Sequence, residues 1–359
     1  MRNALVLAVI FFISMQSCTA PSVSHDTGYE HGKFNVKTRY AWTASEPIIA
    51  PKPEKGRNVI SAKDPSVVFY DGKWHVFYTT CDDKGIWSMQ FISFKDWKDA
   101  KKSKAYPKDK NPNLQGYHCA PHVFYFTPQK KWYMVFQSGQ PQYCTNDDIK
   151  NHDGWTKPVD FFKKAPQGLE KGQWGPEWLD FHCIGDDEYM YLFFTGDNGR
   201  FYRSRTKIGD FPEKMSDPVM VLYDKDRRNI YEGSCTYRIK GQNKYLTIIE
   251  AANGDSWDRY YRSFIADSLD GEWKEQAGSW EEPFAGLMNV KFENSVEPWT
   301  RDISHGELIR AGYDEKMEID PDNLQLLFQG RDPASNGLQY HMLPYRIGLL
   351  KAVRDGAVK

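Results

Sequence analysis

The chain has 359 residues, and its 47 lysines and arginines nearly balance its 48 aspartates and glutamates. The net charge of −1 gives no electrostatic basis for binding nucleic acid or an anionic surface. The length suits one large all-β domain or two smaller domains. Aromatic residues make up 15% of the chain; they suit the cores of β-sheets, and their flat rings can also stack on sugars.

The N-terminal segment has the proportions of a signal peptide. One arginine precedes an apolar stretch from Ala4 to Met15, which is too short to span a bilayer as a helix. Cys18 follows where bacterial lipoproteins carry their lipid. We therefore expect an exported monomer with a lipoprotein-type signal peptide at 1–17 and a flexible tether at 18–35. A single folded domain is expected at 36–359. A lipid-anchored cell-surface or periplasmic form and a secreted form both stay open.

The remaining chain reads as short strands separated by turns. The sequences DGK, TPQKK, GDDE and KGQN each separate two β-rich runs, as hairpins require. No long amphipathic helix pattern occurs. Five cysteines follow Cys18 without zinc or redox spacing, and one or two disulfides would suit an exported protein.

One pattern occurs five times: a polar residue, a first strand, a hairpin turn and an apolar second strand. The copies begin at Asp64, Cys119, Asp180, Glu232 and His305. Repeats of this kind indicate propeller blades, in which the first strand of each blade lines a central channel. We therefore predict an all-β, five-bladed β-propeller whose polar residues project into one axial pocket. The C-terminal run LPYRIGLLKAV is placed to complete the last blade and close the ring.

Three of these polar residues are carboxylates, and three carboxylates in one pocket make hydrolysis the expected chemistry. Asp64 precedes a proline, which restricts its backbone. Asp180 and Glu232 have apolar neighbours in the sequence, where an unpaired charge is costly. The plainer interpretation is that these acids cap turns or pair with lysine and arginine. Their matching places in the repeat favour a functional site.

Several segments resemble a known family. They include KDPSVVFYDGKWHVFYTT, RYYRS, PFAGLMNV, WTRDISHGELIRAGYD and LPYRIGLL, and they occur in order from about residue 40 to 350. The resemblance is to glycoside hydrolase family 62, the α-L-arabinofuranosidases that remove arabinose side chains from arabinoxylan. It implies a five-bladed β-propeller, in agreement with the repeats, and an inverting mechanism. An inverting α-L-arabinofuranosidase acting on arabinoxylan or arabinan is therefore the expected function.

The resemblance implies a role for each of the three acids. Asp64 in KDPS matches the general base of the family, and Glu232 in YEGS matches the general acid. Asp180 in LDFH matches the acid that tunes the proton donor and orients the sugar. Inverting hydrolysis needs these residue types, because a carboxylic acid protonates the leaving oxygen while a carboxylate activates water on the opposite face.

Four more positions match residues around the sugar in the family. Lys63 and Arg259 offer donors to hydroxyl groups, and Tyr345 offers a ring to a backbone xylose. A structural ion pair and a packed aromatic ring are the alternatives for Arg259 and Tyr345. His305 in SHGE matches an axial histidine in the sugar pocket that holds a calcium ion with water ligands.

The resemblance thus implies one structural metal ion in the channel, with calcium as the expected ion. Where the family carries a glutamine near the metal, this chain has His122, and two imidazoles would favour a softer ion such as zinc. A second departure is Gly233, which follows Glu232 where the family usually has alanine. We expect a roomier pocket edge at that glycine.

Two other functions stay open. One is a β-xylosidase or arabinanase of the related glycoside hydrolase family 43, which has the same propeller; the segment SHGELIRAGYD disfavours it. The other is a surface glycan-binding lipoprotein without catalysis. The presence of all three carboxylates argues against such a protein, because a binder has little use for unpaired acids in an apolar pocket.

Overall fold

The computed structural model describes residues 40–52, 54–172, 175–293 and 298–353. The described part consists of strands and short 3-10 helices. No helix in these ranges is long and apolar enough to cross a membrane. The predicted signal peptide, the tether and Cys18 lie outside the described residues.

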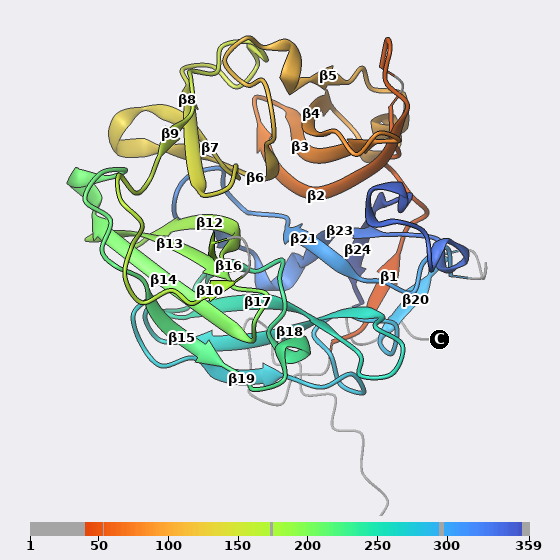
Figure 1. The fold of residues 1–359 in the computed structure, drawn as a ribbon. Helices are drawn as coiled ribbons and strands as arrows, with labels where there is room; N and C mark the ends of the chain where they lie inside the picture. The colour runs from red at the N-terminus through yellow and green to blue at the C-terminus, as the bar shows by residue number, and fades with distance from the viewer. Residues whose placement is uncertain (1–39, 53, 173–174, 294–297, 354–359) are drawn as a thin grey trace, which may run out of the picture.

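Five sheets form the five blades of a β-propeller, which confirms the predicted fold (Figure 1). The first two blades contain β2 (Val59–Tyr70), β3 (Lys73–Asp82), β4 (Trp87–Phe94) and β5 (Tyr106–Pro107), then β6 (Cys119–Phe126), β7 (Lys131–Gln137), β8 (Pro141–Asn146) and β9 (Val159–Asp160). The third contains β12 (Leu179–Gly185), β13 (Tyr189–Thr195), β14 (Arg200–Lys207) and β15 (Val219–Tyr223). The fourth contains β16 (Cys235–Ile239), β17 (Tyr245–Ala252), β18 (Arg259–Ala266) and β19 (Lys274–Ala277), with β22 (Glu318–Ile319) added in parallel to β16.

The fifth blade joins the two ends of the described chain. Its strands follow the order β20 (Val290–Phe292), β1 (Trp42–Ala44), β24 (Arg346–Ala352), β23 (Gln325–Gly330) and β21 (Ser304–Leu308). Trp42 on β1 is paired with Ala352 on antiparallel β24 and with Val290 on parallel β20. The C-terminal strand therefore completes this sheet as predicted, and the N-terminal strand is inserted beside it.

Short elements lie between these strands, both within and between blades. A two-stranded hairpin pairs β10 (Lys171–Gly172) with β11 (Gly175–Pro176). The 3-10 helices are η1 (Trp97–Lys102), η2 (Lys108–Lys110), η3 (Thr127–Gln129), η4 (Ile208–Asp210), η5 (Arg227–Asn229), η7 (Pro321–Asn323), η8 (Pro333–Ser335) and η9 (Tyr340–Met342).

The innermost strands of the first three blades share a local distortion. Asp64 on β2, Ala120 on β6 and Asp180 on β12 have φ values of 47°, 50° and 56°. Each lies within a register shift between the first and second strand of its blade. Such bulges twist a strand and redirect a side chain. In the fourth blade the left-handed residue is Gly233, with φ 58°, so Glu232 comes one position earlier than the acids of the first and third blades.

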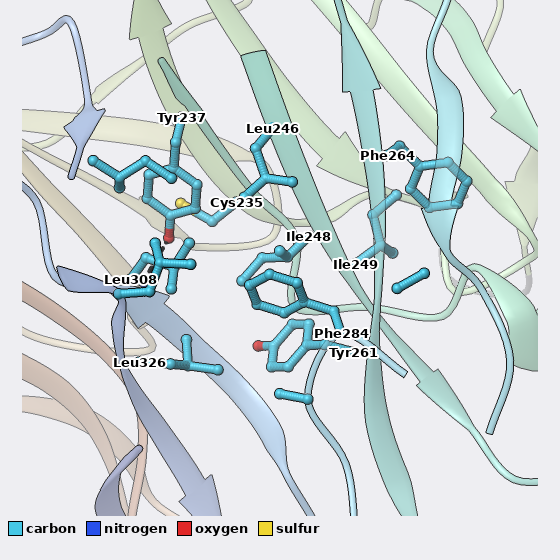
Figure 2. Packing of buried hydrophobic residues seen from close by; sticks show 14 of the residues in the cluster. Cys235, Tyr237, Leu246, Ile248, Ile249, Tyr261, Phe264, Phe284, Leu308 and Leu326 are labelled. Carbon is cyan, nitrogen blue, oxygen red and sulfur yellow. Dashed lines mark hydrogen bonds between the residues drawn. The ribbon is translucent and has the colours of Figure 1, made fainter. Parts of the chain in front are cut away.

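Apolar packing between blades four and five holds the innermost strand β21 in place (Figure 2). Tyr237 and Tyr261 of blade four are fully buried, and each hydroxyl accepts a backbone hydrogen bond from β21. The donors are Leu308 N at 2.8 Å and Gly306 N at 2.6 Å. Since buried tyrosine hydroxyls need such partners, this packing also fixes the position of β21 relative to blade four.

The cysteines of the described residues are all free and buried. They are Cys81, Cys119, Cys144, Cys183 and Cys235. The one or two disulfides considered from the sequence are therefore not formed among them, and these thiols pack as small apolar side chains.

Candidate active site

Side chains from three blades meet at His305. Its Nδ1 lies 3.3 Å from Asp64 Oδ1 and 3.6 Å from Asp180 Oδ2. Burial opposes a charge on the imidazole, but the carboxylates of Asp180 and Asp64 raise the pKa of His305. Burial also disfavours the charged form of Asp180 and raises its pKa to about 6, although the nearby His305 acts to lower that pKa. The structure thus places Asp64 and Asp180 together at His305.

Hydrogen bonds from neighbouring blades hold the backbone of Asp64 and the side chain of Asp180. Asp64 N donates to Gln329 Oε1 at 2.8 Å, and Gly233 N donates to Asp180 Oδ2 at 2.8 Å. Positive φ values are unfavourable for residues with a side chain, and aspartate tolerates them better than most. The first hydrogen bond therefore holds the backbone of Asp64, and the second holds the side chain of Asp180 against blade four.

Glu232 lies beside Arg259 at the edge of the same site. Arg259 Nη2 is 3.8 Å from Glu232 Oε1, and the guanidinium lies 4.0 Å from the ring centroid of Tyr231. Arg259 N also donates to Asp302 Oδ1 at 3.1 Å. The Glu232 side chain is 27% exposed, whereas those of Asp64 and Asp180 are each 9% exposed. Of these three acids, Glu232 is therefore the one most open to a ligand.

Lys63 connects the general-base candidate to two tyrosines. Its Nζ lies 3.9 Å from Asp64 Oδ1, donates to Tyr340 Oη at 2.6 Å and lies 5.0 Å from the ring centroid of Tyr345. Tyr345 is 7% exposed, whereas Tyr340 is 58% exposed and stacks with Trp87 at 5.6 Å. The structure thus packs the ring of Tyr345 and leaves that of Tyr340 open. Sequence reasoning missed Tyr340, which follows an irregular loop without a strand pattern.

Two further carboxylates were also missed. Glu250 on β17 accepts hydrogen bonds from His305 N at 2.8 Å and Ser304 Oγ at 3.1 Å, and burial raises its pKa to about 7. Burial also raises the pKa of Asp197 to about 7, and its Oδ1 lies 3.4 Å from Arg227 Nη1. An acid within the apolar strand sequence TIIEAA was the available signal for Glu250.

Asp197 also lines an open cleft of about 710 Å³. The other lining residues are Glu177, Asn198, Lys225, Asp226 and Arg227. The electrostatic influence of Glu232 and Asp180 on Asp197 indicates that this cleft lies next to the site.

Gly233 does not widen the pocket as expected from the sequence. A Cβ added there would lie 2.9 Å from Glu250 Oε2 and 3.2 Å from the Cα of His305. The space is therefore already filled by these neighbours. Glycine is needed for its positive φ and for this close approach.

The metal expectation can be tested against the donors that the residues present. Nδ1 of His305 faces the carboxylates of Asp64 and Asp180, so an ion on this imidazole would bind through Nε2. His122 Nε2 donates to Cys183 O at 3.1 Å, and its ring lies 6.0 Å from that of His182. Within the described ranges no three His, Cys, Asp or Glu side chains group as a metal site. A hydrated ion on His305 fits these residues, whereas a site that joins His122 to His305 does not.

The sequence and the structure were compared with known proteins. The model of Glycosyl hydrolase family 62 matches residues 41–351. Alpha-L-arabinofuranosidase C from Cellvibrio japonicus is 38% identical over 318 residues, which are 88% of this chain and 48% of that protein. The chain thus spans about half the length of this relative.

Solved structures of the same family are also similar. The catalytic domain of a GH62 α-L-arabinofuranosidase from Coprinopsis cinerea is 40% identical with a TM-score of 0.83, over 88% of this chain and 98% of that one. An α-L-arabinofuranosidase from Podospora anserina, solved with cellotriose, is 37% identical with a TM-score of 0.81, over 89% and 98%. A thermostable family-43 glycoside hydrolase is 14% identical with a TM-score of 0.52 over 82% and 91%, and shares the fold alone. The chain belongs to glycoside hydrolase family 62.

Proposed function

We propose that this protein is an inverting α-L-arabinofuranosidase that removes arabinofuranosyl side chains from arabinoxylan or arabinan. The observation that carries the proposal is the meeting of Asp64 and Asp180 at His305, next to Glu232 and Arg259. Family membership supports it, since the relatives are α-L-arabinofuranosidases and one GH62 hydrolase was solved with xylotriose.

In the proposed reaction Glu232 and Asp64 act on opposite faces of the sugar. Glu232 gives its proton to the glycosidic oxygen as the bond to the anomeric carbon breaks. Asp64 takes a proton from a water molecule, whose oxygen forms the new bond from the other side. The products are arabinose of inverted configuration and the glycan without that side chain, with Asp64 protonated and Glu232 ionised. Proton exchange with solvent restores both acids.

The remaining residues orient the substrate. Asp180 keeps the pocket charge balanced against His305 and accepts a hydrogen bond from the residue after the proton donor. Lys63 and Arg259 are placed to donate to sugar hydroxyls. The open ring of Tyr340, next to Trp87, suits stacking on a backbone xylose better than the packed ring of Tyr345.

We also propose that His305 holds a hydrated metal ion, with calcium as the expected species. Such an ion would supply positive charge beneath the carboxylates and stiffen the channel. The support is the position of His305 beside two carboxylates and the match of SHGE to the family.

Activity can be tested on 4-nitrophenyl α-L-arabinofuranoside and on wheat arabinoxylan, with chromatography of the products. We expect arabinose as the only sugar released from both substrates, together with 4-nitrophenol from the first. Xylose or arabino-oligosaccharides as main products would indicate a family 43-like activity. Binding to arabinoxylan without any product would indicate a glycan-binding protein.

For the protein in its host we propose export as a monomeric lipoprotein. The support is the apolar run from Ala4 to Met15 followed by Cys18. Mass spectrometry of the mature N-terminus should find an acylated Cys18, and the Cys18→Ser variant should lose membrane association. An unmodified N-terminus in the medium would mean that the protein is secreted without a lipid anchor.

A further inference from the structure

Glu250 is the most buried of the carboxylates around the site, since 1% of the residue is exposed. It lies on β17 and is paired through its backbone with the segment that carries Glu232. Glu250 N donates to Glu232 O at 3.0 Å, and Tyr231 N donates to Glu250 O at 3.0 Å. Two backbone hydrogen bonds therefore hold the segment of the proposed proton donor against residue 250.

The side chain of Glu250 faces two other members of the site. Its Oε2 accepts hydrogen bonds from His305 N and Ser304 Oγ. Its Oε1 lies 3.5 Å from Arg259 Nη1, and neither of these two buried atoms has a hydrogen bond among the described residues. The second terminal nitrogen of Arg259, Nη2, lies 3.8 Å from Glu232 Oε1. Arg259 is thus shared between a buried carboxylate and the proton donor.

We propose that Glu250 is a positioning residue for Glu232. Glu250 holds Arg259 beside this proton donor and balances part of the guanidinium charge. This inference rests on the proposed function. An arginine paired with Glu232 alone in a partly desolvated site would favour its ionised form, which cannot protonate a leaving oxygen. Because the guanidinium is divided between two carboxylates, it can orient Glu232 and still allow it to carry a proton.

The Glu250→Gln variant separates the charge from the shape. The amide oxygen can still accept from His305 N, but Arg259 then pairs with Glu232 alone. Substrates that need a proton on the leaving group should suffer most. We expect kcat on arabinoxylan to fall on the order of 10²-fold, and kcat on 4-nitrophenyl α-L-arabinofuranoside to fall less than about 10-fold, because nitrophenolate leaves with little protonation.

A second variant covers the case in which glutamine does not fold. Glu250→Asp keeps the charge but withdraws it from Arg259, so a smaller loss with the same substrate dependence is expected. Glu307 gives a matched control: it is 3% exposed and its Oε1 lies 2.8 Å from Arg310 Nε, and no ion pair links it to the three catalytic candidates. The Glu307→Gln variant should lose thermal stability, with equal effects on both substrates.

Equal losses on both substrates in a folded Glu250 variant, or wild-type kcat on arabinoxylan, would overturn the positioning role. A wild-type enzyme that is inactive on both substrates would instead overturn the proposed function. The two failures are therefore distinguished by the wild-type measurement alone.

Discussion

Asp180 Oδ2 accepts a hydrogen bond from Gly233 N at 2.8 Å, which links the acid of blade three to the residue after Glu232 in blade four. The two blades cannot shift against each other without breaking this bond. The same carboxylate also lies 3.6 Å from His305 Nδ1. Asp180 therefore couples the position of the proton donor to the charge at the channel axis.

Two substitutions of Asp180 should separate charge from backbone strain. Asparagine can keep the bond to Gly233 and tolerates a φ of 56°, so Asp180→Asn should fold normally and lose kcat on the order of 10²-fold. Alanine loses the bond and is strained in this conformation, so Asp180→Ala should in addition lower Tm by about 2 °C or more. Thermal unfolding with kinetics on arabinoxylan checks both. Equal Tm values for the two variants would show that the strain and the bond contribute nothing to stability.

Substitution of Asp64 or Glu232, the proposed base and acid, should abolish most of the activity. Asp64→Ala and Glu232→Ala should each lower kcat on arabinoxylan by on the order of 10³-fold or more, with circular dichroism unchanged. On the nitrophenyl substrate the loss should persist for Asp64→Ala and be smaller for Glu232→Ala, because only the base is still needed. Wild-type-like turnover in either variant would remove that residue from the mechanism.

The stereochemical course follows from the role of Asp64 as a base. Room for a water molecule requires a separation of roughly 6.5–9.5 Å between the carboxyl groups of Asp64 and Glu232. Proton NMR during hydrolysis should therefore detect β-arabinofuranose first, before mutarotation. First-formed α-arabinofuranose would mean retention, and Asp64 would then be a nucleophile.

Asp197 should make stability depend on pH. Its pKa is raised by burial to about 7 in the folded protein, against about 3.9 in the unfolded chain. Its contribution to stability is therefore complete below about pH 4 and is lost as the pH rises through about 7. Asp197→Asn lacks this loss, so its Tm relative to wild type should rise by about 2 °C between pH 5 and 8.

A control for this titration lies in the neighbouring loop. The hydrogen bond from Arg228 lowers the pKa of Asp226, so that carboxyl is ionised in both states above pH 5. The Tm difference of Asp226→Asn should therefore stay constant over the same range. A constant difference for Asp197→Asn as well would mean that Asp197 does not titrate there.

Metal removal tests the proposed ion at His305. Elemental analysis should find one calcium per chain, and dialysis against EDTA should lower Tm while a large part of the activity survives. The His305→Ala variant should no longer respond to EDTA. A metal-free protein with full activity would leave His305 as a partner of Asp64 and Asp180 only. Complete loss of activity that calcium restores would instead give the ion a part in the chemistry.

The blade pattern could be predicted because its signals are local. Alternating apolar strands and hairpin turns recur along the chain, and the polar residue in or next to each first strand indicated which strands line the channel. The one-residue offset of Glu232 was not predictable, since it follows from the left-handed conformation of Gly233 instead of a strand residue.

The supporting residues depend on contacts between distant segments. Glu250 reaches the site through the pairing of β17 and the approach of β21 from another blade. Tyr340 enters it through a hydrogen bond from Lys63. Neither contact leaves a periodic trace in the sequence, and the packed state of Tyr345 could not be distinguished from an open ring before the loop positions were known.

The pairing of Trp42 with Ala352 sets a condition on how the protein forms. During synthesis β1 emerges before the strands β2 to β23, but its antiparallel partner β24 appears only after all of them. Until then the apolar edge of the fifth sheet is unprotected, and contacts between such distant segments form slowly. The pairing of β24 with β1 and β23 should therefore be the step that closes the propeller. A chain shortened before β24 should be bound by chaperones or aggregate.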